Sequence, residues 1–177
     1  KDADWEKAKR VIINAKCDKI SGCNALDKVL VDKNIEDFEG KLKDLRDTFK
    51  ASKVSMMVDG EVKKVLSDEE PITDEATWHE EFLAMKAVIG SAENIDDAIA
   101  KSNKASVKHY RTILTSNREK ASKFMEQVDS VAVYHTASTR FTAGGQMGVG
   151  AELAISTDKL HHRGPLGLEQ LVTNTYY

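Results

Sequence analysis

The sequence feature that most constrains the fold is the alternation of helical and strand-like apolar patterns along residues 1–135. The clearest helical pattern lies in residues 35–49, where apolar residues recur at intervals of three and four. They are Ile35, Phe38, Leu42, Leu45 and Phe49. Such a face can bind a partner helix, but the neighbouring strand patterns favour packing on the chain's own sheet. Strands that alternate with helices pair in parallel, so we predict an α/β fold with a mostly parallel sheet flanked by helices.

The same two periodicities predict further elements on both sides of this helix. The other expected helices span residues 2–16, 95–105 and 117–128. The expected strands span residues 29–31, 82–88, 111–115 and 130–135. Two more apolar runs, 54–58 and 61–66, flank Asp59-Gly60, a pair typical of a two-residue turn. They predict a β-hairpin or two short strands.

Composition and charge describe an ordinary globular protein. The 177 residues are 41% hydrophobic and 31% charged. The net charge is −3, so the sequence lacks the excess of basic residues that is typical of nucleic-acid-binding proteins. No apolar run approaches the ~20 residues that span a bilayer, and no signal peptide is visible, so we expect no membrane contact. Cys17 and Cys23 complete no zinc motif, which favours the absence of a metal and a reducing, cytoplasmic compartment.

Cys23 is the candidate nucleophile. It follows Gly22 on the connection between the helix at 2–16 and the strand at 29–31, and such connections often carry reactive groups. A free cysteine has a pKa of about 8.5 and becomes a strong nucleophile where nearby N–H groups or cations lower it. A lone cysteine is also often a small buried apolar residue, and a disulfide with Cys17 would consume the thiol.

Residues 136–177 break the alternation and form a glycine-rich C-terminal segment, so we divide the chain into an α/β domain at 1–135 and this segment. Its glycines are Gly144, Gly145, Gly148, Gly150, Gly164 and Gly167. Their spacing is neither the dinucleotide fingerprint nor a phosphate-binding P-loop. Turn geometry explains them as well as close approach to a ligand does.

Motifs at both ends of the chain resemble one known family. Near the N-terminus they are Asn14-Ala15-Lys16, Cys23-Asn24-Ala25 and Leu30-Val31. Near the C-terminus they are Val133-Tyr134-His135, residues 137–142, Gly144-Gly145, Gly148, residues 150–152, 155–157 and 159–161, Arg163-Gly164-Pro165 and Gly167-Leu168-Glu169. In this order they resemble glutamate-5-semialdehyde dehydrogenase (γ-glutamyl phosphate reductase) of the aldehyde dehydrogenase superfamily, from residue 2 to residue 177. The resemblance implies the catalytic domain of the aldehyde dehydrogenase fold.

The resemblance also implies a reaction and its residues. The family reduces γ-glutamyl phosphate to glutamate 5-semialdehyde with NADPH, a step of proline biosynthesis. Cys23 is then the thiol that displaces phosphate and forms a thioester. The implied substrate-binding residues are Asn24, Ser138, Thr139 and Arg140, and Glu81 resembles the glutamate that contacts the cofactor ribose. Two alternatives stay open: Asn24 caps a turn, and Arg140 forms a surface ion pair.

The chain departs from the family's pattern at Asp27, Thr136, Ala143 and Met147. The pattern also extends beyond both ends of the chain, so we expect an excised catalytic domain that lacks most of the NADP-binding half and is inactive alone. The resemblance implies a homo-oligomer at full length and a glutamate kinase partner. The alternative is a non-catalytic α/β module that keeps the fold and serves subunit or partner contacts.

Overall fold

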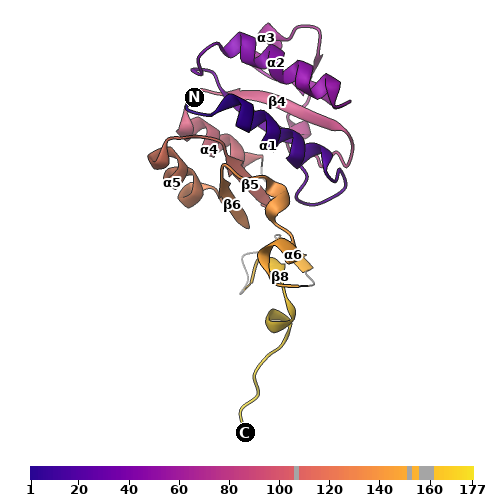
Figure 1. Cartoon of the computed structure of the whole chain (residues 1–177), viewed down its shortest axis with the longest axis vertical. Helices are drawn as coiled ribbons and strands as arrows, with labels where there is room; N and C mark the ends of the chain where they lie inside the picture. The colour runs from indigo at the N-terminus through magenta and orange to yellow at the C-terminus, as the bar shows by residue number, and fades with distance from the viewer. Residues whose placement is uncertain (106–107, 151–152, 156–161) are drawn as a thin grey trace.

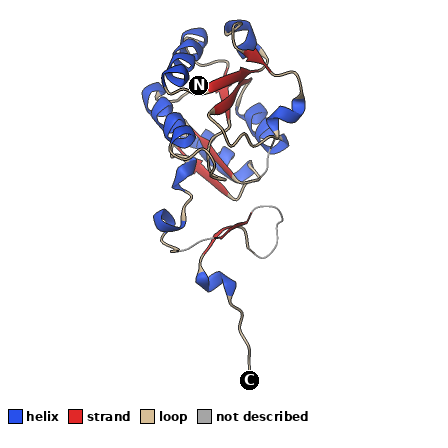
Figure 2. Cartoon of the chain, turned by 90° about the vertical axis from the view of Figure 1, so that its right-hand side faces the viewer, coloured by secondary structure: helices blue, strands red, loops and turns tan. Residues whose placement is uncertain are grey.

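The computed structural model describes residues 1–105, 108–150, 153–155 and 162–177. The helices before α6 and the parallel strands form one body, and the described residues from α6 onwards project away from it (Figures 1 and 2). No helix in the described part of the chain is long and apolar enough to cross a membrane.

The described residues form three small sheets. The main sheet is parallel in the order β1-β4-β2-β3, with β1 (Lys28–Asp32), β2 (Ser55–Val58), β3 (Glu70–Pro71) and β4 (Lys86–Ala92). The second sheet pairs β5 (Tyr110–Ile113) in parallel with β6 (Ala132–His135). The third pairs β7 (Leu153–Ile155) with β8 (Gly164–Leu166), antiparallel. The predicted mostly parallel α/β fold is therefore confirmed, although its strands fall into separate sheets.

Helices cover both faces of the main sheet. The α-helices are α1 (Trp5–Cys17), α2 (Phe38–Ala51), α3 (Glu61–Val65), α4 (Ile95–Lys104), α5 (Arg118–Gln127) and α6 (Gly144–Met147). The 3₁₀ helices are η1 (Glu75–Trp78), η2 (Thr139–Phe141) and η3 (Leu168–Leu171). Figure 1 shows α2 and α3 on one side of β4 and α4 with α5 on the other.

The apolar face predicted for residues 35–49 packs on the main sheet. Leu42, Leu45 and Phe49 are buried in one cluster with side chains of β1, β2 and β4. The helix itself begins only at Phe38, because Asp37 takes a left-handed backbone conformation and its carboxylate accepts a hydrogen bond from the Gly40 N–H. This face is therefore used inside the chain.

The predicted hairpin over residues 54–66 is wrong. Residues 55–58 form a strand, but residues 61–65 form α3, with Val62 fully buried. Both edges of β2 are occupied by parallel neighbours, β4 and β3, so the chain must cross over through a helix rather than turn back. The strand expected at 82–88 also begins later, at Lys86, and runs to Ala92. The domain boundary after residue 135 stays a prediction.

A buried ion pair closes the connection between α1 and β1. The Lys16 side chain has no exposed area, and its ammonium lies 2.8 Å from the Asp27 carboxylate. The other oxygen of Asp27 accepts a hydrogen bond of 3.2 Å from the Phe82 N–H. A charged amine is stable in the interior only when a partner offsets its lost hydration. The two ends of the segment that carries Cys23 are thereby held together.

Replacing Asp27 tests this closure. Asp27→Ala leaves the Lys16 ammonium buried without its carboxylate, so the free energy of unfolding should fall by about 3–5 kcal/mol. Asp47→Ala on α2 is the control: Asp47 is 66% exposed and pairs with Arg46 at the surface, so its loss should cost about 0–1 kcal/mol. Urea unfolding followed by circular dichroism measures both. Equal effects of the two substitutions would contradict the buried pair.

Candidate active site

Cys23 lies on the surface of a connection that is fixed from several sides. Its thiol is free and exposed. The Ala25 N–H donates to the Gly22 carbonyl at 2.8 Å, and the Leu26 N–H donates to the Ala15 carbonyl of α1 at 2.9 Å. With the Lys16–Asp27 pair, these bonds give the connection a defined path. An accessible thiol on a fixed segment suits a nucleophile.

Asn24 joins this connection to η2, which follows it by more than a hundred residues. Its side-chain N–H₂ donates to the Thr142 carbonyl at 2.7 Å, and its backbone carbonyl accepts from the Thr139 hydroxyl at 2.7 Å. Its amide oxygen accepts a hydrogen bond from Arg140. Two predicted substrate-binding residues, Asn24 and Thr139, are thus buried and bonded to each other. In this structure they hold the Cys23 segment in place.

Arg140 and Ser138 lie beside the same connection. The Arg140 guanidinium pairs with the Asp18 carboxylate at 2.9 Å, just after α1. The Ser138 hydroxyl accepts a hydrogen bond of 3.3 Å from the Arg140 N–H and caps η2. The ion-pair alternative therefore describes how Arg140 lies here, while substrate binding by Ser138, Thr139 and Arg140 stays a prediction.

Tyr110 is a neighbour of Cys23 that sequence reasoning missed. Its hydroxyl lies 3.9 Å from the Cys23 sulfur, and its ring is buried at the start of β5. The two residues are 87 positions apart, so no local pattern could connect them. A hydroxyl at this place can accept from the thiol or donate to a thiolate.

Glu81 lies close to the imidazole of His109. Its carboxylate lies 3.7 Å from the His109 imidazole, and its side chain is 45% exposed. Burial lowers the pKa of His109, with Glu81 acting against this shift and Arg111 adding to it. The imidazole is therefore mainly neutral at neutral pH, and the contact with Glu81 is not a full ion pair.

One cavity of about 300 Å³ gathers most of the predicted residues. Those that line it are Cys23, Asn24, Glu81 and Thr139. Tyr110 and His109 line it too, whereas Ser138 and Arg140 lie outside its lining. The cavity is bounded by β1 and β5, so the site lies where the main sheet meets the second sheet. We call it the thiol cavity.

The fit of a dinucleotide to the described residues is partial. Glu81 offers a carboxylate that could accept hydrogen bonds from a ribose hydroxyl. Gly148 and Gly150 have φ angles of 75° and 74°, a left-handed conformation that favours glycine, so turn geometry accounts for these two glycines. The motif residues at 151–152 and 156–161 lie outside the described residues. Among the described residues, no group of three His, Cys, Asp or Glu side chains could hold a metal ion.

Comparison with known proteins gives relatives along nearly the whole chain. No family model matches it. A protein from Dictyoglomus thermophilum named gamma-glutamyl phosphate reductase is 46% identical over 177 residues, covering 99% of this chain. A protein of the same name from Clostridium acetobutylicum is 42% identical over 181 residues. The chain spans 41% of the length of each of these relatives.

Solved structures agree with the sequence relatives. The crystal structure of gamma-glutamyl phosphate reductase from Thermotoga maritima matches 98% of the chain with a TM-score of 0.92 and 40% identity, and the chain covers 41% of it. An acetylating aldehyde dehydrogenase from Geobacillus thermoglucosidasius matches with a TM-score of 0.69 at 14% identity, which shows a shared fold alone. The chain is therefore homologous, over nearly all of its length, to part of gamma-glutamyl phosphate reductase, a glutamate-5-semialdehyde dehydrogenase, and it has the fold of the aldehyde dehydrogenases.

Proposed function

We propose that this chain is the catalytic part of an NADPH-dependent reductase that converts γ-glutamyl phosphate to glutamate 5-semialdehyde in proline biosynthesis. The observation that carries the proposal is the position of Cys23: an exposed thiol on a connection closed by a buried ion pair, in one cavity with Glu81. The names of the relatives supply the substrate class. Because the chain spans 41% of their length, the rest of the cofactor site would lie in the remainder of such a protein.

The chemistry assigned to Cys23 is nucleophilic. Its thiolate attacks the γ-carbonyl carbon of the acyl phosphate; a C–S bond forms, the C–O bond to phosphate breaks, and phosphate leaves with the electron pair. Tyr110, whose hydroxyl lies 3.9 Å from the sulfur, can donate a hydrogen bond to the thiolate before the attack. NADPH, when bound, supplies the hydride that reduces the thioester. The thiohemiacetal on Cys23 then releases the aldehyde and restores the thiolate.

Substrate and cofactor contacts follow from the remaining residues. Ser138, Thr139 and Arg140 would bind the substrate's α-carboxylate, with the Arg140 fork exchanging Asp18 for the ligand. Asn24 would hold the Cys23 segment and face the bound substrate from the cavity wall. Glu81, on the same cavity, would accept hydrogen bonds from the ribose of NADP. A cytoplasmic location and a glutamate kinase partner stay predictions from the resemblance.

A second candidate function is a non-catalytic module for subunit contacts. The C-terminal segment projects from the rest of the chain (Figure 2). The observation that favours subunit contacts is that large apolar side chains of this segment are exposed: Met147, Leu168, Leu171, Val172, Tyr176 and Tyr177. Apolar surface of this extent is often covered by another protein surface. Subunit contacts through this segment would not by themselves exclude catalysis, since a homo-oligomer can use the segment while Cys23 reacts.

The two cysteines should differ in reactivity. Cys23 is exposed, whereas burial raises the pKa of the Cys17 thiol and leaves it less thiolate at neutral pH. In the folded chain, iodoacetamide should therefore modify Cys23 faster than Cys17, as measured by mass spectrometry of digested time points. In urea the two rates should become equal. Equal rates in the folded chain would argue against an accessible, positioned Cys23.

The activity itself is tested in a chain completed with the remaining portion of the Dictyoglomus thermophilum relative. With glutamate 5-semialdehyde, inorganic phosphate and NADP, this protein should form NADPH by the reverse reaction, and Cys23→Ser should abolish it. Cys17→Ser is the matched control and should keep most of the rate. The chain alone should form no NADPH. If the completed Cys23→Ser protein stays active, the proposed mechanism is wrong.

A further inference from the structure

Two cations line the thiol cavity without a carboxylate partner among the described residues: Lys28, the first residue of β1, and Arg111 of β5. The Lys28 ammonium donates to the Glu80 carbonyl and lies 4.6 Å from the centroid of the Phe82 ring. The Arg111 guanidinium donates to the carbonyls of Tyr110 at 2.8 Å and Ala105 at 3.5 Å. Both cations thus donate hydrogen bonds only to neutral carbonyl groups of the described residues.

The protein environment works against these charges. Burial lowers the pKa of Arg111 and of Lys28, and the positive charge of Arg111 lowers that of Lys28 further. Asp27, Glu80 and Glu81 act in the opposite direction on Lys28, but they do not reverse the shift. Two neighbouring, partly buried cations raise the free energy of the folded chain unless an anion joins them.

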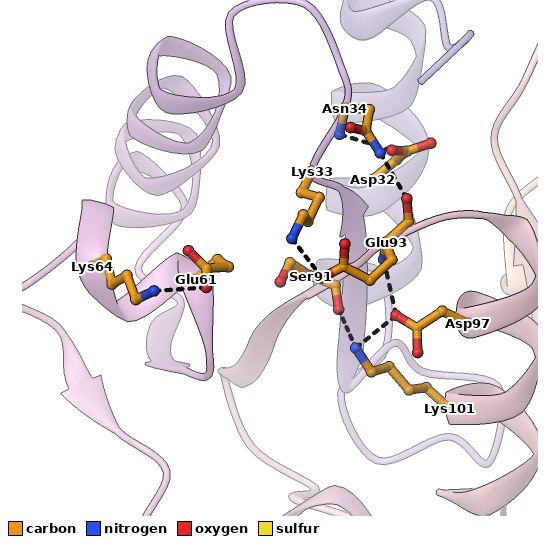
Figure 3. Close-up of polar contacts among 9 residues, drawn as sticks. All are labelled: Asp32, Lys33, Asn34, Glu61, Lys64, Ser91, Glu93, Asp97 and Lys101. Carbon is orange, nitrogen blue, oxygen red and sulfur yellow. Dashed lines mark hydrogen bonds and ion pairs between the residues drawn. The ribbon is translucent and has the colours of Figure 1, made fainter.

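At the carboxyl ends of the strands of the main sheet, three lysines form ion pairs with carboxylates (Figure 3). There Lys33 pairs with Glu93 at 2.5 Å, Lys101 with Asp97 at 2.8 Å, and Lys64 with Glu61 at 2.7 Å. The chain has 29 acidic and 26 basic residues, so carboxylates are in excess. Carboxylates line the thiol cavity too, among them Asp27, Glu80 and Glu81. That neither Lys28 nor Arg111 forms an ion pair with them indicates that a partner of the two cations comes from solution.

The chemistry of this partner follows from the two groups. A guanidinium presents a planar fork that matches the oxygens of phosphate or carboxylate, and two of its donors already fix its position on backbone carbonyls. An ammonium adds a point charge that suits phosphate. Both line the cavity that Cys23 also lines.

We propose that Lys28 and Arg111 form an oxyanion subsite of the thiol cavity, which binds the phosphate group that leaves in the forward reaction and enters in the reverse one. The existence of the subsite is inferred from the two cations and the cavity that they line, whereas the identity of the anion rests on the proposed function. The same two groups could hold the α-carboxylate of the substrate or a phosphate of NADP, because all of these are oxyanions.

Calorimetric titration of the chain with inorganic phosphate tests the subsite. Arg111→Met and Lys28→Met should each weaken phosphate binding about tenfold, the loss of one charged hydrogen bond. Lys33→Met is the matched control: Lys33 is paired with Glu93 at the carboxyl ends of β1 and β4, so phosphate affinity should not change. Arg111→Lys keeps the positive charge but loses the planar fork, so its phosphate affinity should lie between those of the unchanged chain and Arg111→Met. Thermal unfolding shows whether each variant folds. If Arg111→Met does not fold, Lys28→Met alone tests the subsite.

Parallel titrations with glutamate and with NADP separate the sources of the anion. Phosphate binding that depends on both Lys28 and Arg111 supports the subsite. Absence of phosphate binding, or equal affinity in all variants, overturns it. If only the binding of glutamate or of NADP depends on Lys28 and Arg111, and phosphate binding does not, the assignment to the leaving phosphate is overturned. Failure of the subsite and failure of the proposed function are distinguishable, because the function is tested by the Cys23-dependent formation of NADPH.

Discussion

The candidate site depends on the buried contact between Lys16 and Asp27. Lys16 ends α1 and Asp27 precedes β1, so their 2.8 Å contact holds together the two ends of the segment that carries Cys23. Asp27 also accepts a hydrogen bond from the Phe82 N–H, which fixes the segment next to Glu81. One carboxylate therefore positions both the proposed nucleophile and the proposed ribose-binding residue, and its removal would disturb the two together.

The remaining contacts bring distant parts of the chain to the amino ends of the strands. Asn24 ties the Cys23 segment to η2, and β5 brings Tyr110 to the thiol. Ligands of open parallel α/β sheets usually bind beyond the carboxyl ends of the strands. Here that end of the main sheet carries ion pairs such as Lys33–Glu93, whereas the Cys23 thiol lies beside Tyr110, the first residue of β5. The thiol cavity extends along the whole of β1 and β5.

Sequence reasoning succeeded where the signal is local. The apolar spacing of residues 35–49 gave the buried face of α2, and the family motifs marked Cys23, whose proposed role awaits test. The hairpin at 54–66 was wrong because the parallel neighbours of β2 lie far along the chain. Tyr110 was missed for the same reason. Lys16 left a usable signal, since it lies four residues after the buried Ile12 and so on the same helix face.

The central claim is that Cys23 forms a covalent bond to the acyl group. In the chain completed with the rest of a relative, glutamate 5-semialdehyde and NADP without phosphate should leave the thioester with no acceptor, so it should accumulate. Intact-mass and peptide mass spectrometry should then show a glutamyl adduct on the peptide that contains Cys23, which disappears when phosphate is added. NADPH formation without any adduct on Cys23, or an adduct on Cys17 instead, would contradict the account.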